Sequence, residues 1–237
     1  MKLQTEPLNT PQHVLKSISE LPIGTGFLAF RDLDFLIRKY IVGREALDFG
    51  CGVGRSSRFL KEHGMNVVAV DISKKLLNEA IKLSKDINYI LIERNCIKSI
   101  GSQFDLIFIS FVLMEIPTRK EIIMIIKKLT KLLSNGGKFI IIVASDDFYT
   151  SNWLSIDTSC SKLNPSSGDV VSVYLKDYCL TINDYFWKET DCEHCFEQGS
   201  LKILKKLKPL GSHSDGKHWI DEYIKAPFVI YVLSKIL

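Results

Sequence analysis

Two segments of the sequence combine glycines and acids in a pattern that could bind a ligand. The segment Asp48-Phe49-Gly50-Cys51-Gly52-Val53-Gly54 follows a short apolar run and precedes a helical pattern. Glycines at such a strand-to-helix turn let the backbone bend sharply and approach a ligand closely, because they lack a Cβ. A second apolar run ends on Asp71, where a carboxylate can accept hydrogen bonds from both hydroxyls of a ribose. The glycine loop (Gly50 to Gly54) and Asp71 together predict a pocket for a ligand that contains adenosine.

The glycine spacing indicates which kind of adenosine ligand is expected. A dinucleotide-binding loop has the pattern G-x-G-x-x-G, with a helix N-terminus facing the pyrophosphate. Here the spacing is G-x-G-x-G, and Arg55 occupies the position of the last dinucleotide glycine. A nicotinamide-dependent dehydrogenase is therefore the less favoured alternative. Asp48 either contacts the ligand or fixes the turn of the loop, and the two roles are compatible.

Short β-rich runs alternate with amphipathic segments from about residue 45 onward. This alternation indicates an α/β fold with a doubly wound, mostly parallel, seven-stranded sheet and helices on both faces. Continuous apolar runs such as Phe139 to Val143 are typical of strands that are buried on both faces. The expected strands are 46–49, 67–70, 89–92, 106–110, 138–143, 201–207 and 228–234, and the expected helices are 56–63, 74–84, 119–133 and 189–198.

Two further regions are expected around this sheet. Residues 1–43 predict an N-terminal helical cap of two helices, separated by Pro22 to Gly26, and residues 44–237 predict a Rossmann-like domain. An insertion at about 145–198, after strand five, carries a β-hairpin rich in aromatic residues. We expect this hairpin to form a lid over a small acceptor, with Tyr185 and Trp187 facing the substrate. The alternative is that both rings only pack the hairpin onto the sheet.

The composition excludes several classes of protein. Hydrophobic residues make up 46% and charged residues 24% of the chain, as in soluble globular proteins, and the polar N-terminus lacks the apolar core of a secretory signal. We therefore expect a cytoplasmic protein with no membrane partner. A net charge of +4 over 237 residues is weak, so a nucleic-acid partner is not expected. Cys192 and Cys195 have no second pair of ligands nearby, so no metal site is expected.

The glycine loop, together with the acid that ends the next strand, resembles the class I S-adenosylmethionine-dependent methyltransferases, in the small-molecule group called type 11. The likeness covers about residues 44 to 144 and includes Gln103 to Ile107 as the fourth strand and Leu132 to Lys138 as the turn before strand five. It implies S-adenosylmethionine as cofactor and methyl transfer to a nitrogen or oxygen of a small molecule. Tyr185-Phe186-Trp187, ahead of a helix and a glycine, is also loosely similar to toxoflavin-synthase-like methyltransferases.

The resemblance also implies roles for individual residues. Asn95 is expected to accept a hydrogen bond from the adenine amino group, with the backbone of Cys96 next to the ring. Arg31 is expected to bind the carboxylate of the cofactor, the alternative being a salt bridge with Asp32 or Asp34. The full set of expected cofactor-binding residues is Arg31, Asp48, Gly50, Cys51, Gly52, Gly54, Asp71, Ile72, Asn95, Cys96 and Ser110.

Few catalytic side chains are expected, because a sulfonium activates its own methyl group. Glu115 is the first candidate for a general base, ahead of Asp146 and Asp147, and has an equal claim to be a helix-start acid. The loop Ser110-Phe111-Val112 lacks the N/D-P-P-Y/F/W pattern of enzymes that methylate nucleic-acid bases. A catalytically silent protein that binds the cofactor remains the main alternative, and the sequence does not indicate the oligomeric state.

Overall fold

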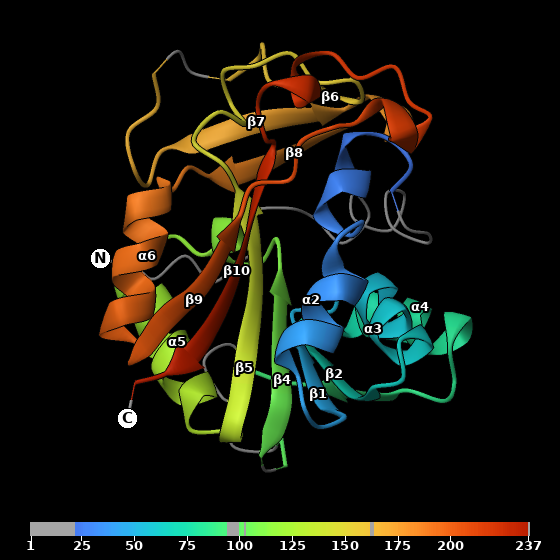
Figure 1. Ribbon diagram of the computed structural model, residues 1–237, viewed down its shortest axis with the longest axis vertical. Helices are drawn as coiled ribbons and strands as arrows, with labels where there is room; N and C mark the ends of the chain where they lie inside the picture. Colours follow the sequence, from blue (N-terminus) through green and yellow to red (C-terminus); the bar gives the residue numbers. More distant parts are fainter. Residues whose placement is uncertain (1–21, 94–99, 102, 162–163, 237) are drawn as a thin grey trace.

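The computed structural model describes residues 22–93, 100–101, 103–161 and 164–236. Its main element is a seven-stranded sheet with the order β3-β2-β1-β4-β5-β10-β9 (Figure 1). Strand β10 runs antiparallel to both of its neighbours, whereas β1 to β5 pair in parallel. The expected mostly parallel sheet is confirmed. The strands are β1 (Glu45–Phe49), β2 (Asn66–Asp71), β3 (Asn88–Leu91), β4 (Phe104–Ser110), β5 (Leu133–Ala144), β9 (Leu201–Leu207) and β10 (Phe228–Lys235).

Helices cover both faces of this sheet, with α2, α3 and α4 on one face and α5 and α6 on the other (Figure 1). Two helices begin at side-chain caps: Ser73 accepts from the N–H of Leu76 before α4, and Thr118 accepts from the N–H of Glu121 before α5. The helices are α2 (Leu33–Tyr40), α3 (Arg55–Glu62), α4 (Lys74–Leu83), α5 (Arg119–Thr130) and α6 (Glu189–Gln198).

The core lies on both sides of the central strands. In β4, the buried side chains of Leu106 and Phe108 join the cluster under α2 and α3, whereas Ile107 and Ile109 join the cluster under α5 and α6. Successive side chains of a strand point to opposite faces, so an uninterrupted apolar run fills both cores at once. The expectation that these strands are buried on both faces is confirmed.

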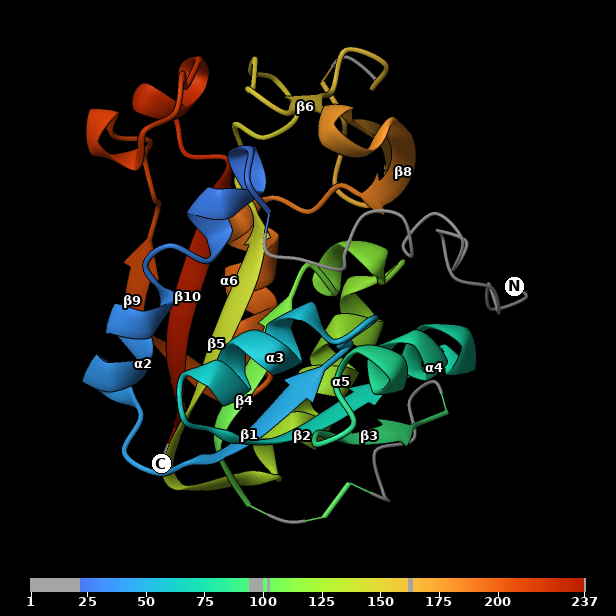
Figure 2. The same cartoon turned by 90° about the vertical axis from the view of Figure 1, so that its right-hand side faces the viewer.

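A separate antiparallel sheet covers the carboxyl ends of the parallel strands (Figures 1 and 2). We call it the lid sheet; it consists of β6 (Ile156–Asp157), β7 (Val170–Leu175) and β8 (Leu180–Tyr185). Strands β7 and β8 form the expected hairpin, in which Leu175 pairs with Leu180 around a short 3-10 turn, Lys176–Tyr178. The two-residue strand β6 was not expected, because two residues show no periodicity.

The second half of the expected helical cap is built differently from the prediction. A 3-10 turn, Thr25–Ala29, precedes α2, so the chain bends where one helix was expected. The first expected helix lies outside the described residues. Over the part of the chain that the structure describes, no helix has the length and apolarity that crossing a membrane requires.

One buried carboxylate joins three distant parts of the chain beside the lid sheet. Glu222 has no exposed surface, and its Oε1 accepts from the hydroxyl of Thr25 and the backbone N–H of Leu154, both at 2.8 Å. Its Oε2 accepts from the N–H of Ile220 at 2.9 Å. Thr25 in turn donates its own N–H to the Ser155 hydroxyl at 2.9 Å. The N-terminal turn, the segment before β6 and the loop before β10 are thereby held together.

Candidate functional site

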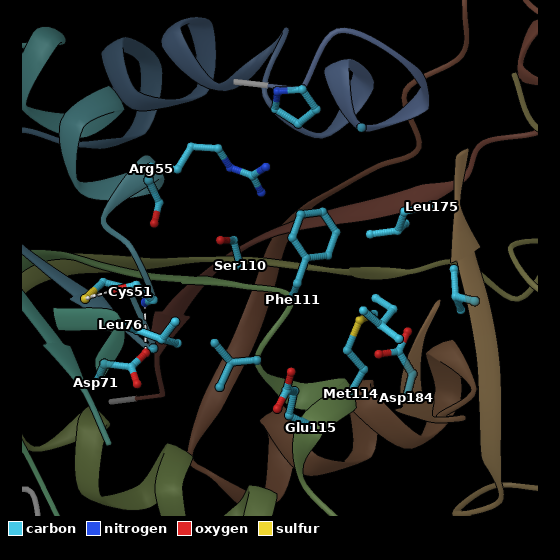
Figure 3. Close-up of a pocket in the computed structure, with 18 of the residues that line it drawn as sticks. Cys51, Arg55, Asp71, Leu76, Ser110, Phe111, Met114, Glu115, Leu175 and Asp184 are labelled. Carbon is cyan, nitrogen blue, oxygen red and sulfur yellow. Dashed lines mark hydrogen bonds between the residues drawn. The ribbon is translucent and has the colours of Figure 1, made fainter. Parts of the chain in front are cut away.

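A cavity of about 340 Å³ lies between the carboxyl edge of the main sheet and the lid sheet. Cavities of roughly 300–1,000 Å³ typically hold small-molecule ligands. In Figure 3, Cys51 and Asp71 lie on one side of the cavity, and Met114 and Asp184 lie on the other. Phe111 stands between the two sides, so the cavity extends from the glycine loop to the lid sheet.

The glycine loop has a backbone that favours glycine. Gly50, Gly52 and Gly54 have φ angles of 74°, 56° and 77°, in the left-handed region. The N–H groups of Gly50 and Cys51 both donate to the carbonyl of Val70, at 2.9 and 3.0 Å, which ties the loop to β2. A Cβ on Gly50 would come within 2.4 Å of Val112, whereas a Cβ on Gly52 would meet nothing within 4 Å. Because Gly52 lines the cavity, the missing side chain leaves open space for a ligand there.

Asp71 lines the cavity at the tip of β2, and its carboxylate is fixed by the backbone. Its Oδ2 accepts from the N–H of Gly52 and its Oδ1 accepts from the N–H of Ser73, both at 2.8 Å. Burial raises the pKa of Asp71, although these N–H donors oppose the rise. A carboxylate offers about four acceptor positions, so each oxygen can accept one more hydrogen bond from a ligand hydroxyl.

Asp48 lies behind the loop and does not line the cavity. Its Oδ2 accepts from the hydroxyls of Ser56 and Ser57, at 2.7 and 2.5 Å, at the start of α3. Burial raises its pKa to about 6, and the two serine donors oppose that rise. Of the two roles considered for Asp48, the geometry supports fixing the turn between β1 and α3.

Arg55, the first residue of α3, extends its guanidinium toward the cavity that it lines (Figure 3). The guanidinium lies 5.0 Å from the ring centroid of Phe30, and within the described chain it has no hydrogen bond or ion pair, although the charge of Asp48 acts on it from behind the loop. Burial lowers the pKa of Arg55 to about 10. A largely buried cation without an anionic partner is costly, so this position is suited to an anionic group of a ligand.

Arg31, the arginine expected to bind the cofactor carboxylate, does not line the cavity. Its guanidinium donates to Asp32 at 2.8 Å, to Asp215 at 3.1 Å and to the carbonyl of Leu210 at 2.8 Å. The carboxylates of Asp32 and Asp215 therefore already neutralise its charge. Of the two acids named in the salt-bridge alternative, Asp32 does pair with Arg31, whereas Asp34 pairs with Arg38.

The other expected cofactor residues divide into three groups. Gly50, Cys51, Gly52, Asp71, Ile72 and Ser110 all line the cavity. Gly54 does not; a Cβ there would lie 2.3 Å from the hydroxyl of Tyr89, so this glycine allows close packing against β3. Asn95 and Cys96 lie outside the described residues.

Only one of the three candidate bases reaches the cavity. Glu115 lines it from the 3-10 turn Leu113–Glu115 after β4. Asp146 is occupied elsewhere: its Oδ1 accepts from the N–H of Glu189 at 2.8 Å, and its own N–H donates to Glu189 at 3.0 Å. Asp147 does not line the cavity.

Tyr185 and Trp187 are placed behind the cavity wall rather than in it. Both line a much smaller space between the lid sheet and β5, and the indole N–H of Trp187 donates to the carbonyl of Ile116 at 3.1 Å. In β8 the side chains that line the cavity are those of Ile182 and Asp184. Since side chains alternate along a strand, Tyr185 points the other way. This placement agrees with the packing alternative.

Asp184 is a cavity residue that the sequence did not single out. Its side chain is buried, and its Oδ2 accepts from the hydroxyl of Tyr149 at 3.3 Å. Burial first, and then the charge of Glu115, raise its pKa to about 8. The sequence does contain a signal for this residue. Asp184 follows Ile182 by two positions, so both side chains lie on one face of the strand, and an acid is unusual on a half-buried face.

Comparison with known proteins agrees with this geometry. The family model described as "Methyltransferase domain" matches residues 47–141. The chain is 32% identical over 100 residues to the ubiquinone biosynthesis O-methyltransferase of Coxiella burnetii, an alignment that covers 40% of this chain and 42% of that protein. It spans about two fifths of the length of the curated relatives that it matches.

Solved structures show the same fold over most of the chain. The PH0226 protein of Pyrococcus horikoshii has a TM-score of 0.67 and 19% identity, with 95% of this chain and 96% of that chain covered. A putative S-adenosylmethionine-dependent methyltransferase of Listeria monocytogenes has a TM-score of 0.59 and 20% identity, with 85% and 97% covered. The family match includes most of β1, the glycine loop, Asp71 and most of β5. Residues 47–141 therefore match a methyltransferase domain, and they lie within a fold that the chain shares with these solved structures.

Proposed function

We propose that the protein transfers a methyl group from S-adenosylmethionine to a nitrogen or oxygen of a small-molecule acceptor. The observation that carries the proposal is the unit formed by Gly52 and Asp71, which presents a fixed carboxylate next to an open backbone position at one end of the cavity. A nucleoside fits such a unit, because its ribose hydroxyls need acceptors and its flat ring system needs close approach to the backbone.

The residues around the glycine loop fit the rest of the cofactor. Asp71 would accept from the ribose hydroxyls, and Ile72 and Leu76 supply apolar surface beside it. Arg55 would bind the carboxylate of the methionine moiety, because its half-buried guanidinium forms no ion pair in the described chain and lines the cavity. Arg31 was the sequence-based candidate for this role, and Arg55 replaces it in the proposal.

The cofactor supplies a positively charged sulfonium whose methyl group is already electrophilic. What remains for the chain is to align the acceptor and to exclude water. Val173, Leu175 and Ile182 of the lid sheet close the cavity opposite the main sheet with apolar side chains. Glu115 lies where it could take a proton from the acceptor.

Two measurements test this function. Calorimetric titration of S-adenosylmethionine and S-adenosylhomocysteine should give binding of one molecule per chain, while NAD⁺ should not bind. Incubation of the protein and a metabolite extract with methyl-labelled S-adenosylmethionine should then transfer label to a low-molecular-weight product, identified by mass. Tight binding of NAD⁺ in place of S-adenosylhomocysteine would support the dehydrogenase alternative. Cofactor binding with no labelled product in any extract would support the catalytically silent alternative.

A further inference from the structure

The charged groups that line the cavity are unevenly distributed. Among the described lining residues, Arg55 is the single cation, whereas Asp71, Glu115, Asp177 and Asp184 are acids. Asp71 and Arg55 belong to the glycine-loop side, where the proposed cofactor binds. Glu115 and Asp184 lie away from that side, toward Met114 (Figure 3). This part of the cavity therefore has two carboxyl groups and, in the described chain, no basic side chain.

Asp184 is the more constrained of the two acids. Asp184 is 3% exposed, and the hydroxyl of Tyr149 donates to its Oδ2 at 3.3 Å, which is a long hydrogen bond. No described residue donates to Oδ1, the second carboxylate oxygen. Buried carboxylates are normally satisfied by donors or by a cation, so the cavity side of Asp184 lacks a partner that a ligand could supply.

The electrostatics agree with this interpretation. Burial and the neighbouring Glu115 raise the pKa of Asp184 to about 8. Both effects make the ionised form costly, and both would be relieved by a cation placed between the two carboxyl groups. A positive charge beside Asp184 would therefore stabilise its ionised form.

The remaining walls suit an organic cation rather than a metal ion. Met114 and Ile182 give this end of the cavity apolar side chains, and the ring of Phe111 stands at its border, with the ring centroid of Phe228 5.2 Å away from its own. Aromatic faces attract organic ammonium groups, and apolar side chains accommodate their carbon skeleton. Within the described residues, no cluster of three or more side chains that could hold a metal ion is present.

We propose that the acceptor is an amine, bound as its ammonium ion between Asp184 and Glu115, and that Asp184 takes the proton that the amine must lose. This inference rests on the proposed methyl transfer and specifies its substrate class. It selects a nitrogen nucleophile over the hydroxyl that remained possible above, and it places Asp184 rather than Glu115 as the group that takes the proton.

The proton and electron balance is complete without a further reactant. An N–H bond of the ammonium breaks, its proton moves to a carboxylate oxygen of Asp184, and the electron pair stays on nitrogen. That pair forms the bond to the methyl carbon while the carbon–sulfur bond breaks and its electrons remain on sulfur. The products are a methylated ammonium ion, a neutral thioether and a protonated Asp184, so the total charge is conserved. Burial and the charge of Glu115 both raise the pKa of Asp184, and a raised pKa makes its carboxylate a better proton acceptor.

Binding of three probes of similar shape to the cofactor-free protein tests the substrate class. The probes are phenethylamine, 2-phenylethanol and 3-phenylpropanoate, measured by ligand-observed NMR titration at pH 7. The ammonium should bind at least about 10-fold more tightly than the alcohol, and the carboxylate least tightly, because a charged hydrogen bond in a buried site outweighs a neutral one. Equal affinity for the amine and the alcohol, or no binding of the amine, would overturn the proposal.

Single substitutions test whether the carboxyl group of Asp184 gives the preference for the amine. Asp184→Asn keeps an acceptor for Tyr149 and should remove most of the preference for the amine. The matched control, Asp147→Asn, removes an acid outside the cavity and should keep the preference. If Asp184→Asn does not fold, Glu115→Gln replaces it and should reduce the preference. An unchanged preference in a folded Asp184→Asn protein would contradict the assignment.

Proton release provides a readout that is independent of turnover. Calorimetry of phenethylamine in buffers with different ionisation enthalpies should show that the wild type releases a proton near pH 7, because the bound cation ionises Asp184. Asp184→Asn should not. Failure of these binding tests while S-adenosylhomocysteine still binds would reject the amine assignment alone, whereas loss of S-adenosylhomocysteine binding would reject the proposed function.

Discussion

The Oδ2 atom of Asp71 accepts a hydrogen bond from the backbone N–H of Gly52 at 2.8 Å, which joins the tip of β2 to the loop after β1. The carboxylate thus orients the loop and at the same time faces the cavity. A change at Asp71 consequently affects both the shape of the loop and the partner offered to a ligand.

Asp71→Ala should weaken binding of S-adenosylmethionine and S-adenosylhomocysteine by about 1–3 kcal/mol, because bonds from ribose hydroxyls to a charged acceptor are lost. Calorimetry on the folded variant measures this directly. The control Glu79→Ala changes a partly exposed acid of α4 that pairs with Lys82 and should leave both affinities unchanged. Unchanged affinity in folded Asp71→Ala protein would remove the ribose assignment.

Arg55→Gln should weaken S-adenosylmethionine by about 10-fold or more and have much less effect on 5′-methylthioadenosine, which lacks the carboxylate. Arg31→Gln is the matched comparison, because its guanidinium is already bound by Asp32 and Asp215. Competition calorimetry with both ligands distinguishes the two arginines. A selective loss in Arg31→Gln instead would restore the sequence-based assignment.

Gly52→Ala and Gly54→Ala should affect different properties. Both glycines have positive φ, so each substitution costs roughly 1–2 kcal/mol of backbone strain. The methyl group at position 52 meets nothing in the empty protein and should mainly reduce cofactor affinity. At position 54 it meets Tyr89, so the melting temperature should fall further. Thermal denaturation and calorimetry on both variants check this, and equal losses of affinity at equal stability would contradict it.

Asp184 should make the cofactor-free protein less stable as the pH rises. Its pKa is about 8 in the folded protein, above the unfolded value of about 4, so between these pH values the folded state holds a proton that the unfolded state has lost. Its contribution to stability is therefore lost as the pH rises from about 4 to about 8. The melting temperature of Asp184→Asn relative to wild type should increase from pH 5 to pH 9, whereas that of Asp147→Asn should not. If the difference in melting temperature between Asp184→Asn and wild type did not change with pH, the carboxyl group of Asp184 would not be the titrating group.

Trp187→Phe should lower the melting temperature, because the hydrogen bond to the carbonyl of Ile116 is lost behind the cavity. Cofactor affinity should stay within about 0.5 kcal/mol of wild type, as for a residue outside the site. Methyl transfer, once an acceptor is known, should fall only with the folded fraction. A large rise in the KM of the acceptor at full stability would favour the original expectation that Trp187 faces the substrate.

The sequence was informative wherever local pattern determines structure. The helix at Glu189–Gln198 has the predicted bounds, and Gly199 follows it, because an amphipathic run and a terminating glycine are both local signals. The apolar run of β4 likewise predicted a strand with two buried faces.

Contacts between distant residues could not be predicted in this way. Asp215 pairs with Arg31 from the far end of the chain, so the sequence alone could not show that this arginine is neutralised and Arg55 is not. For β8, alternation divides the side chains into two sets, but which set faces the cavity depends on how the lid sheet lies over the main sheet. Tyr185 and Trp187 were therefore assigned to the wall that Ile182 and Asp184 occupy.

The position of Glu222 also constrains the order in which the site can form during synthesis. A ribosome releases the chain from its N-terminus, and the glycine loop, Asp71 and β4 can pair as soon as the first half has emerged. Thr25 and Leu154 gain their acceptor only when Glu222 is made, 68 residues after Leu154. The N-terminal turn and the segment before β6 can therefore be joined through Glu222 only after residue 222 has left the exit tunnel.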